Sequence, residues 1–122
     1  MSATKRLTLI HGRHVAGNLY NCNSEKLANI AYLINLVKNA AKIGNMTLLD
    51  IKSWKIGNGV SVVGIVLESH ISIHTWPEHS FATVDVYSCG AHTDPEKAFD
   101  YIASSLEAQK IEKKVLDRSY EI

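Results

Sequence analysis

The sequence contains few residues that break secondary structure or form disulfides, and it has no long apolar segment. Its 122 residues include only two prolines and two cysteines. The cysteines, Cys22 and Cys89, lie far apart, and we expect each to be either a small buried residue or a reactive thiol rather than half of a disulfide. No apolar run is long enough for a signal peptide or a membrane span, which favours a cytoplasmic protein without a membrane partner.

Blocks of charge of one sign are also absent. Thirteen Lys and Arg residues nearly balance twelve Asp and Glu residues, which leaves a formal net charge of +1. This balance gives no electrostatic support for binding nucleic acid, so we do not expect it as a partner. The hydrophobic share of 46% and the charged share of 20% are ordinary for a globular protein, and 122 residues suit a single domain.

What the sequence does contain is an alternation of strand and helix patterns. One helix is predicted from Asn23 or Ser24 to Gly44, and a second over 95–107 with Asp94 as its cap. Alternating or β-branched residues predict strands over 7–20, 46–56, 60–67, 70–76, 81–89 and 110–117. This order predicts an α+β two-layer sandwich, a mainly antiparallel sheet with two helices on one face.

The segment 66–78, VLESHISIHTWPE, places proton-transfer and nucleophile residues in a stretch that otherwise reads as core. Successive residues of a strand point to opposite faces, so His70, Ser72 and His74 are predicted to share one face. A loop at 77–80 would fold this strand back on the next as a hairpin. The register that such a loop implies brings together Trp76 with Phe81, His74 with Thr83, His70 with Tyr87, and Cys89 with Glu68 and Ser69.

Three chemistries could use these residues. A metal site from His70, His74 and Cys89 is disfavoured, because histidines four apart on a strand lie about 13 Å apart at ~3.3 Å per residue. A Cys89 nucleophile with a histidine base has no supporting local signature. The third chemistry is cleavage of the chain by itself between Glu68 and Ser69. For each residue alone a packing role is the simpler interpretation, but their joint occurrence at the end of a buried strand favours chemistry.

Three segments resemble one known family. GRHVAGNLY (12–20), GVSVVGIVLESHISIHTWPE (59–78) and ATVDVYSCG (82–90) are similar to the prokaryotic S-adenosylmethionine decarboxylases, pyruvoyl-dependent enzymes of spermidine biosynthesis. Counted from Ser69, His74 follows by five residues, Cys89 follows by twenty and Ser61 precedes by eight, and all four positions match the family's spacing. The resemblance extends from Gly12 into the second predicted helix.

The resemblance implies that the chain processes itself. Ser69 would attack the Glu68 carbonyl to give an ester, with His74 as proton acceptor and Ser61 assisting. Elimination and hydrolysis would then leave a pyruvoyl group at the position of Ser69. The single domain 1–122 would thereby become a beta chain, 1–68, and an alpha chain, 69–122.

The resemblance also implies a catalytic apparatus. The pyruvoyl carbonyl from Ser69 would form a Schiff base with S-adenosylmethionine, Cys89 would donate a proton, and no metal would be needed. Trp76 and Glu78 match positions at the family's substrate pocket. Trp54 is the aromatic residue nearest to the place where the family usually carries one for adenine. A homodimer of αβ protomers is expected, with two sites near the protomer interface.

Two other functions remain open at this point. A related branch of the same fold decarboxylates arginine through a pyruvoyl group, and the retained Trp-Pro-Glu of 76–78 favours S-adenosylmethionine over it. A non-catalytic α+β binding module would keep the fold without the chemistry. The presence or absence of two fragments that divide at Glu68–Ser69 distinguishes this module from either enzyme.

Overall fold

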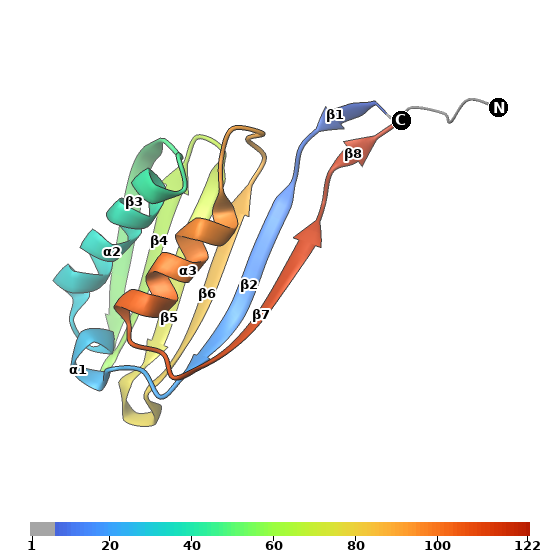
Figure 1. Ribbon diagram of the computed structural model, residues 1–122. Helices are drawn as coiled ribbons and strands as arrows, with labels where there is room; N and C mark the ends of the chain where they lie inside the picture. The colour runs from blue at the N-terminus through green and yellow to red at the C-terminus, as the bar shows by residue number, and fades with distance from the viewer. Residues whose placement is uncertain (1–6) are drawn as a thin grey trace.

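A computed structural model describes residues 7–122 as a two-layer α+β sandwich (Figure 1). Its main sheet has six antiparallel strands in the order β3-β4-β5-β6-β2-β7, and the helices lie on one face of that sheet. The strands of this sheet are β2 (Arg13–Tyr20), β3 (Leu48–Ile56), β4 (Gly59–Val66), β5 (Ser69–Trp76), β6 (Phe81–Ser88) and β7 (Lys110–Asp117). The predicted fold class is confirmed.

The helical layer differs from the prediction at its start. The single helix expected over 23–44 is wrong, because the chain forms α1 (Ser24–Leu27) and α2 (Ile30–Ile43) instead. Asn29 separates them: its backbone is extended, with φ −98° and ψ 99°, and its side chain accepts a hydrogen bond from the Tyr32 amide. A second capping residue therefore begins a new helix inside a continuous helical pattern. The other predicted helix is α3 (Pro95–Ser105), with Asp94 as its cap.

The two ends of the described chain pair with each other outside the main sheet. The strand expected over 7–20 divides around Gly12 into β1 (Thr8–Ile10) and β2. β1 pairs with β8 (Tyr120–Glu121), which was not predicted, and the two-stranded ribbon leads away from the body of the molecule (Figure 1). A two-residue strand carries no sequence pattern of its own. Its existence depends on the chain that it pairs with.

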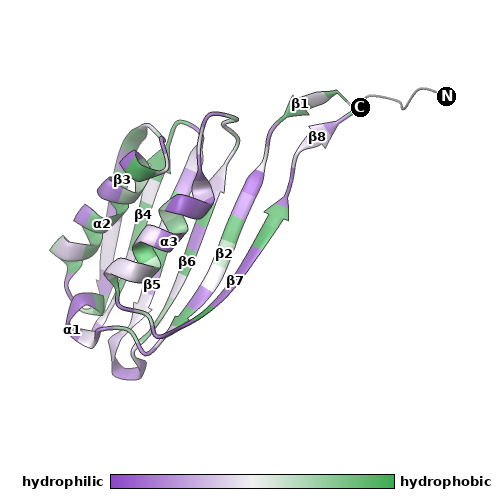
Figure 2. Cartoon of the chain, viewed as in Figure 1, coloured by the Kyte–Doolittle hydropathy of each residue, from purple (hydrophilic) through white to green (hydrophobic). Residues whose placement is uncertain are grey.

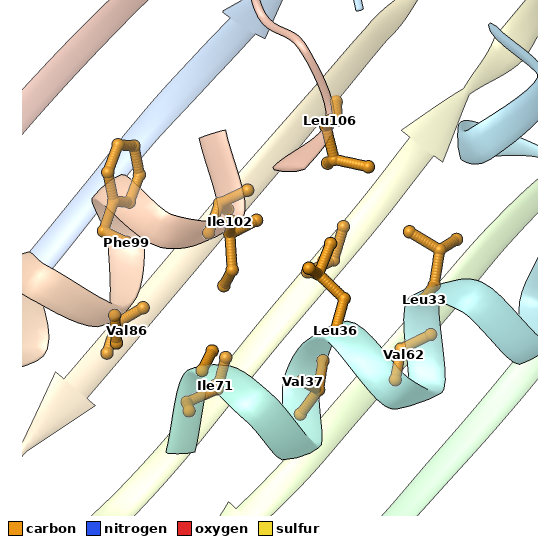
Figure 3. Close-up of a cluster of buried hydrophobic side chains, with 14 of the residues drawn as sticks. Leu33, Leu36, Val37, Val62, Ile71, Val86, Phe99, Ile102 and Leu106 are labelled. Carbon is orange, nitrogen blue, oxygen red and sulfur yellow. The ribbon is translucent and has the colours of Figure 1, made fainter. Parts of the chain in front are cut away.

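The core lies between the sheet and the helices. The buried residues of β2, Val15 and Leu19, belong to this core, and Figure 2 shows hydrophobic positions between hydrophilic ones along the strand. Ile71 and Ile73 of β5 are fully buried there, as is Phe99 of α3. Figure 3 shows this cluster, which includes Leu33, Leu36, Val37, Val62, Ile71, Val86, Phe99, Ile102 and Leu106. Removing these side chains from water is the main force that holds the two layers together.

Gly17 lets α3 approach the sheet closely. A Cβ at this position would lie 2.6 Å from Cζ of Phe99 and 2.4 Å from the Glu112 carbonyl oxygen on β7. We expect Gly17→Ala to lower the free energy of unfolding by about 1–3 kcal/mol, the usual cost of overpacking a core. Urea denaturation measures this, and Phe99→Leu in the same background should restore part of the loss. A change below about 0.5 kcal/mol, the usual scale of a surface substitution, would contradict the close packing.

The opposite face of the sheet is not covered by any helix of residues 7–122. It carries the even-numbered residues of β5, as the alternation predicts, and Trp54 and Trp76 are 66% and 40% exposed. Ile65 and Leu116 add exposed apolar surface. We call this side the uncovered face. Polar and aromatic groups from several strands meet on this face.

Candidate active site

The hairpin register predicted from the sequence is confirmed. Pro77–His79 forms a short 3₁₀ helix, η1, that connects β5 to β6. The observed pairs include Trp76 with Phe81, His74 with Thr83, His70 with Tyr87, and Ser69 with Ser88. A register slip of one residue would have moved every side chain of β5 to the other face.

Glu68 and Ser69 lie where β5 begins, and the loop after β6 holds their peptide unit. The Cys89 amide donates a hydrogen bond of 2.8 Å to the Glu68 carbonyl oxygen, so the predicted proximity of these residues is confirmed. Gly90 packs so closely that a Cβ there would lie 2.8 Å from Cγ of Glu68. A backbone N–H directed at a carbonyl oxygen polarises that carbonyl and stabilises negative charge on it.

The Glu68 side chain is anchored by two groups that the sequence analysis did not identify. It is only 5% exposed, and its two carboxylate oxygens contact the Thr47 amide at 3.0 Å and Nε2 of His92 at 2.9 Å. Burial opposes ionisation, but the hydrogen bonds from Thr47 and His92 outweigh it and lower the pKa of Glu68 below its ordinary value. The carboxylate therefore stays charged and in place at neutral pH.

Ser69 has an unusual backbone and a histidine beside its hydroxyl. Its φ is 157°, outside the negative range that strand residues ordinarily use. Ser69 Oγ lies 3.2 Å from Nδ1 of His70. The His70 ring packs in turn against Tyr87, with 6.0 Å between ring centroids. The sequence analysis placed His70 opposite Tyr87 and considered it as a metal ligand, but it gave His70 no role in the chemistry of Ser69.

A second polar cluster lies at the other end of β5. Ser61 Oγ and Nδ1 of His74 are hydrogen-bonded at 2.9 Å across the β4–β5 pair. A pocket of about 430 Å³ adjoins them, and its lining also includes Trp76 and Glu78. Trp54 stands opposite Ser61 on β3. Five residues selected from the sequence are therefore gathered at this end of the uncovered face.

The two clusters do not meet within one chain. His74 follows Ser69 by five residues on the same strand. About 16 Å therefore separates them at a rise of ~3.3 Å per residue. Cys89 and Glu68 lie with Ser69, whereas Ser61 lies with His74. Within one chain, the predicted site residues therefore lie in two separate groups.

The two cysteines differ in their environment. Cys22 is 6% exposed, and burial raises the pKa of its thiol to about 11. Cys89 is exposed beside Glu68. A buried neutral thiol behaves as a small apolar side chain, so Cys89 is the thiol placed for chemistry. Within residues 7–122 no three His, Cys, Asp or Glu side chains are grouped to hold a metal ion, and no helix has the length and apolarity to cross a membrane.

Known proteins are similar to this chain in both fold and sequence. A solved structure, the adenosylmethionine decarboxylase from Aquifex aeolicus, superposes with a TM-score of 0.83 at 36% identity, covering 89% of this chain and 91% of that one. The fold and the site thus define an enzyme of the α+β decarboxylase type. A family profile described as S-adenosylmethionine decarboxylase matches residues 13–119. The chain belongs to the S-adenosylmethionine decarboxylase family.

Curated relatives agree with this assignment. A protein of Sulfurisphaera tokodaii is 66% identical over 110 residues, which is 90% of each chain. A protein of Sulfolobus acidocaldarius is 55% identical over 121 residues, which is 99% of each chain. Both are named S-adenosylmethionine decarboxylase proenzyme, so their names describe a precursor that is converted into the active form.

Proposed function

We propose that this protein cleaves itself between Glu68 and Ser69 and then decarboxylates S-adenosylmethionine through a pyruvoyl group formed from Ser69. The observation that carries the proposal is the hydrogen bond from the Cys89 amide to the Glu68 carbonyl, with the Ser69 hydroxyl on the next residue. The names of the relatives supply the substrate and the precursor state. The product would be decarboxylated S-adenosylmethionine, an aminopropyl donor for spermidine biosynthesis.

Self-cleavage would need only groups of the chain itself and water. Ser69 Oγ attacks the Glu68 carbonyl carbon, the C–N bond breaks, and an ester with a free Ser69 amine results. A base, assigned to His74, then removes the Ser69 Cα proton, and the Cβ–Oγ bond breaks with Glu68 leaving as a carboxylate. The dehydroalanine that remains takes up water and releases ammonia, which leaves the keto group. No external oxidant or reductant is consumed.

The residues around Ser69 fit a pyruvoyl group. Cys89 and the main chain of Glu68 already flank the position, and the anchored Glu68 side chain keeps this environment in place. A pyruvoyl group supplies the electrophilic carbonyl that accepts the electrons released by decarboxylation. The exposed Cys89 thiol can donate the proton that the substrate carbon then needs.

The pocket beside His74 is the proposed substrate site. Glu78 can accept hydrogen bonds from ribose hydroxyls. Trp76, which packs against Phe81 with 5.6 Å between ring centroids, presents an aromatic surface to adenine or to the sulfonium cation. Trp54 is available for the same purpose on the neighbouring strand.

A second copy of the chain is required if His74 serves Ser69. One chain holds these residues about 16 Å apart by the rise of a strand, so the His74 that reaches Ser69 must belong to another protomer. The uncovered face, where Ser61 and His74 lie, is the surface available for that contact, and it exposes Trp54, Ile65 and Leu116. We therefore propose a homodimer with two shared sites.

Intact-mass measurement combined with two decarboxylation assays tests the proposed function. Purified protein should yield fragments 1–68 and 69–122, the second with a pyruvoyl terminus. Carboxyl-labelled S-adenosylmethionine should release labelled carbon dioxide, and carboxyl-labelled arginine should not. Release from arginine alone would identify the related decarboxylase. A folded chain that never divides would identify a binding module.

Shared sites predict that two inactive variants rescue each other. Ser69→Ala lacks the nucleophile and His74→Ala lacks the base, so neither should mature alone. In a mixed dimer, the Ser69 of the His74→Ala chain faces the intact His74 of its partner, and that chain should divide. Co-expression of differently tagged variants and mass analysis of the doubly tagged dimers measures this. Division of neither chain in the mixed dimers would contradict a shared site.

A further inference from the structure

The Ser69 hydroxyl needs a base for the first step of self-cleavage, and His70 is the histidine beside it. A serine hydroxyl is a weak nucleophile until a neighbouring group accepts its proton. Nδ1 of His70 lies 3.2 Å from Ser69 Oγ, whereas His74 of the same chain lies at the far end of β5. The His70 ring is partly buried and rests against Tyr87, which limits its orientation.

We propose that His70 is the catalytic base that takes the hydroxyl proton of Ser69 during ester formation. This inference rests on the proposed self-cleavage and divides it between two histidines. His70 acts on Oγ in the first step, within its own chain. His74 of a second copy acts on the Cα proton in the later elimination.

The first step then balances on groups that the structure places together. The Oγ–H proton passes to Nδ1 of His70, which is unprotonated in the tautomer that carries hydrogen on Nε2. Oγ bonds to the Glu68 carbonyl carbon, and the resulting oxyanion accepts the hydrogen bond from the Cys89 amide. The C–N bond breaks, and His70 returns the proton to the Ser69 nitrogen. The imidazole ends the step as it began.

The surroundings of the bond support this assignment. The carboxylate contacts to Thr47 and His92 hold Glu68 in place, so its carbonyl carbon stays beside Oγ while the proton moves. Nε2 of His92 lies 2.9 Å from Oε2 of Glu68, so this imidazole contacts the carboxylate. The imidazole that contacts the Ser69 hydroxyl is that of His70. Ser69 supplies the nucleophile and the Cys89 amide supplies the oxyanion donor, and His70 supplies the base that the step also requires.

Two substitutions of His70, compared with His74→Ala, test the proposal. His70→Ala removes the imidazole, and His70→Asn keeps a hydrogen-bond acceptor near the position of Nδ1 but is not a base. Each full-length precursor would be followed by intact mass during synthesis, with and without hydroxylamine, and its folding checked by circular dichroism. Hydroxylamine cleaves an ester and would leave a hydroxamate on Glu68.

Both His70 variants should divide about 100-fold or more slowly than the natural chain, in line with the loss of a general base. Hydroxylamine should not cleave them, because no ester accumulates. His74→Ala should accumulate ester and divide readily in hydroxylamine. Natural-rate division of either His70 variant, or hydroxylamine-sensitive ester in both, would overturn the proposal. Failure of the natural chain itself to divide would instead contradict the proposed function.

Discussion

Replacing Ser69 with alanine should leave the protein as one uncleaved, inactive chain. Alanine has no hydroxyl to attack Glu68, so neither the ester nor the keto group can form. We expect a single mass for residues 1–122 and no release of carbon dioxide from S-adenosylmethionine above background. The fold should persist, since Ser69 Oγ makes one side-chain contact, and a typical hydrogen bond contributes about 1 kcal/mol.

Ser72→Ala is the matched control for this variant. Ser72 lies on the same strand and loses the same hydroxyl, but it is opposite Asp85 in the middle of the sheet. The control should divide and turn over substrate as the natural protein does. Division between residues 68 and 69 in the Ser69→Ala chain would show that the proposed maturation is wrong.

Replacing Cys89 with alanine should separate maturation from catalysis. The backbone amide that contacts the Glu68 carbonyl remains in alanine, so the chain should still divide. The thiol proton is lost, and kcat should fall by about 10²–10⁴-fold, the usual contribution of a general acid. Intact mass reports the first effect and labelled carbon dioxide the second.

The other cysteine provides the control. Cys22→Ala removes a thiol that is 6% exposed and neutral at ordinary pH, so it should affect stability and leave kcat within about twofold. Both variants remove a thiol, so a loss of kcat in Cys89→Ala alone would show that turnover depends on the thiol at this position. Full turnover by Cys89→Ala would remove Cys89 from the role of proton donor.

The sequence was most informative where one periodicity governs the structure. The hairpin register follows from the alternation in β5 and β6 together with the short loop after Trp76. The separation of Ser69 from His74 also follows from strand geometry, by the same reasoning that disfavours a metal between His70 and His74. The match to the family's spacing does not by itself show this separation, which comes from the rise of the strand.

The sequence was least informative where distant segments meet. His92 and Thr47 reach Glu68 from two different loops, and no periodicity relates those positions. Asn29 ends one helix and begins another inside a pattern that reads as continuous, because the side-chain cap competes with the helix at that point. The β1–β8 ribbon likewise depends on the pairing of the two ends of the described chain.

By itself, then, the sequence determined which residues face the helices and which face away, because side chains alternate along a strand whatever surrounds it. It also determined that Cys89 would lie beside Glu68, because a short hairpin loop leaves little freedom of register. Tertiary structure alone decided which groups anchor the Glu68 carboxylate and which histidine reaches the Ser69 hydroxyl. Those contacts depend on the packing of loops and side chains, which no local pattern encodes.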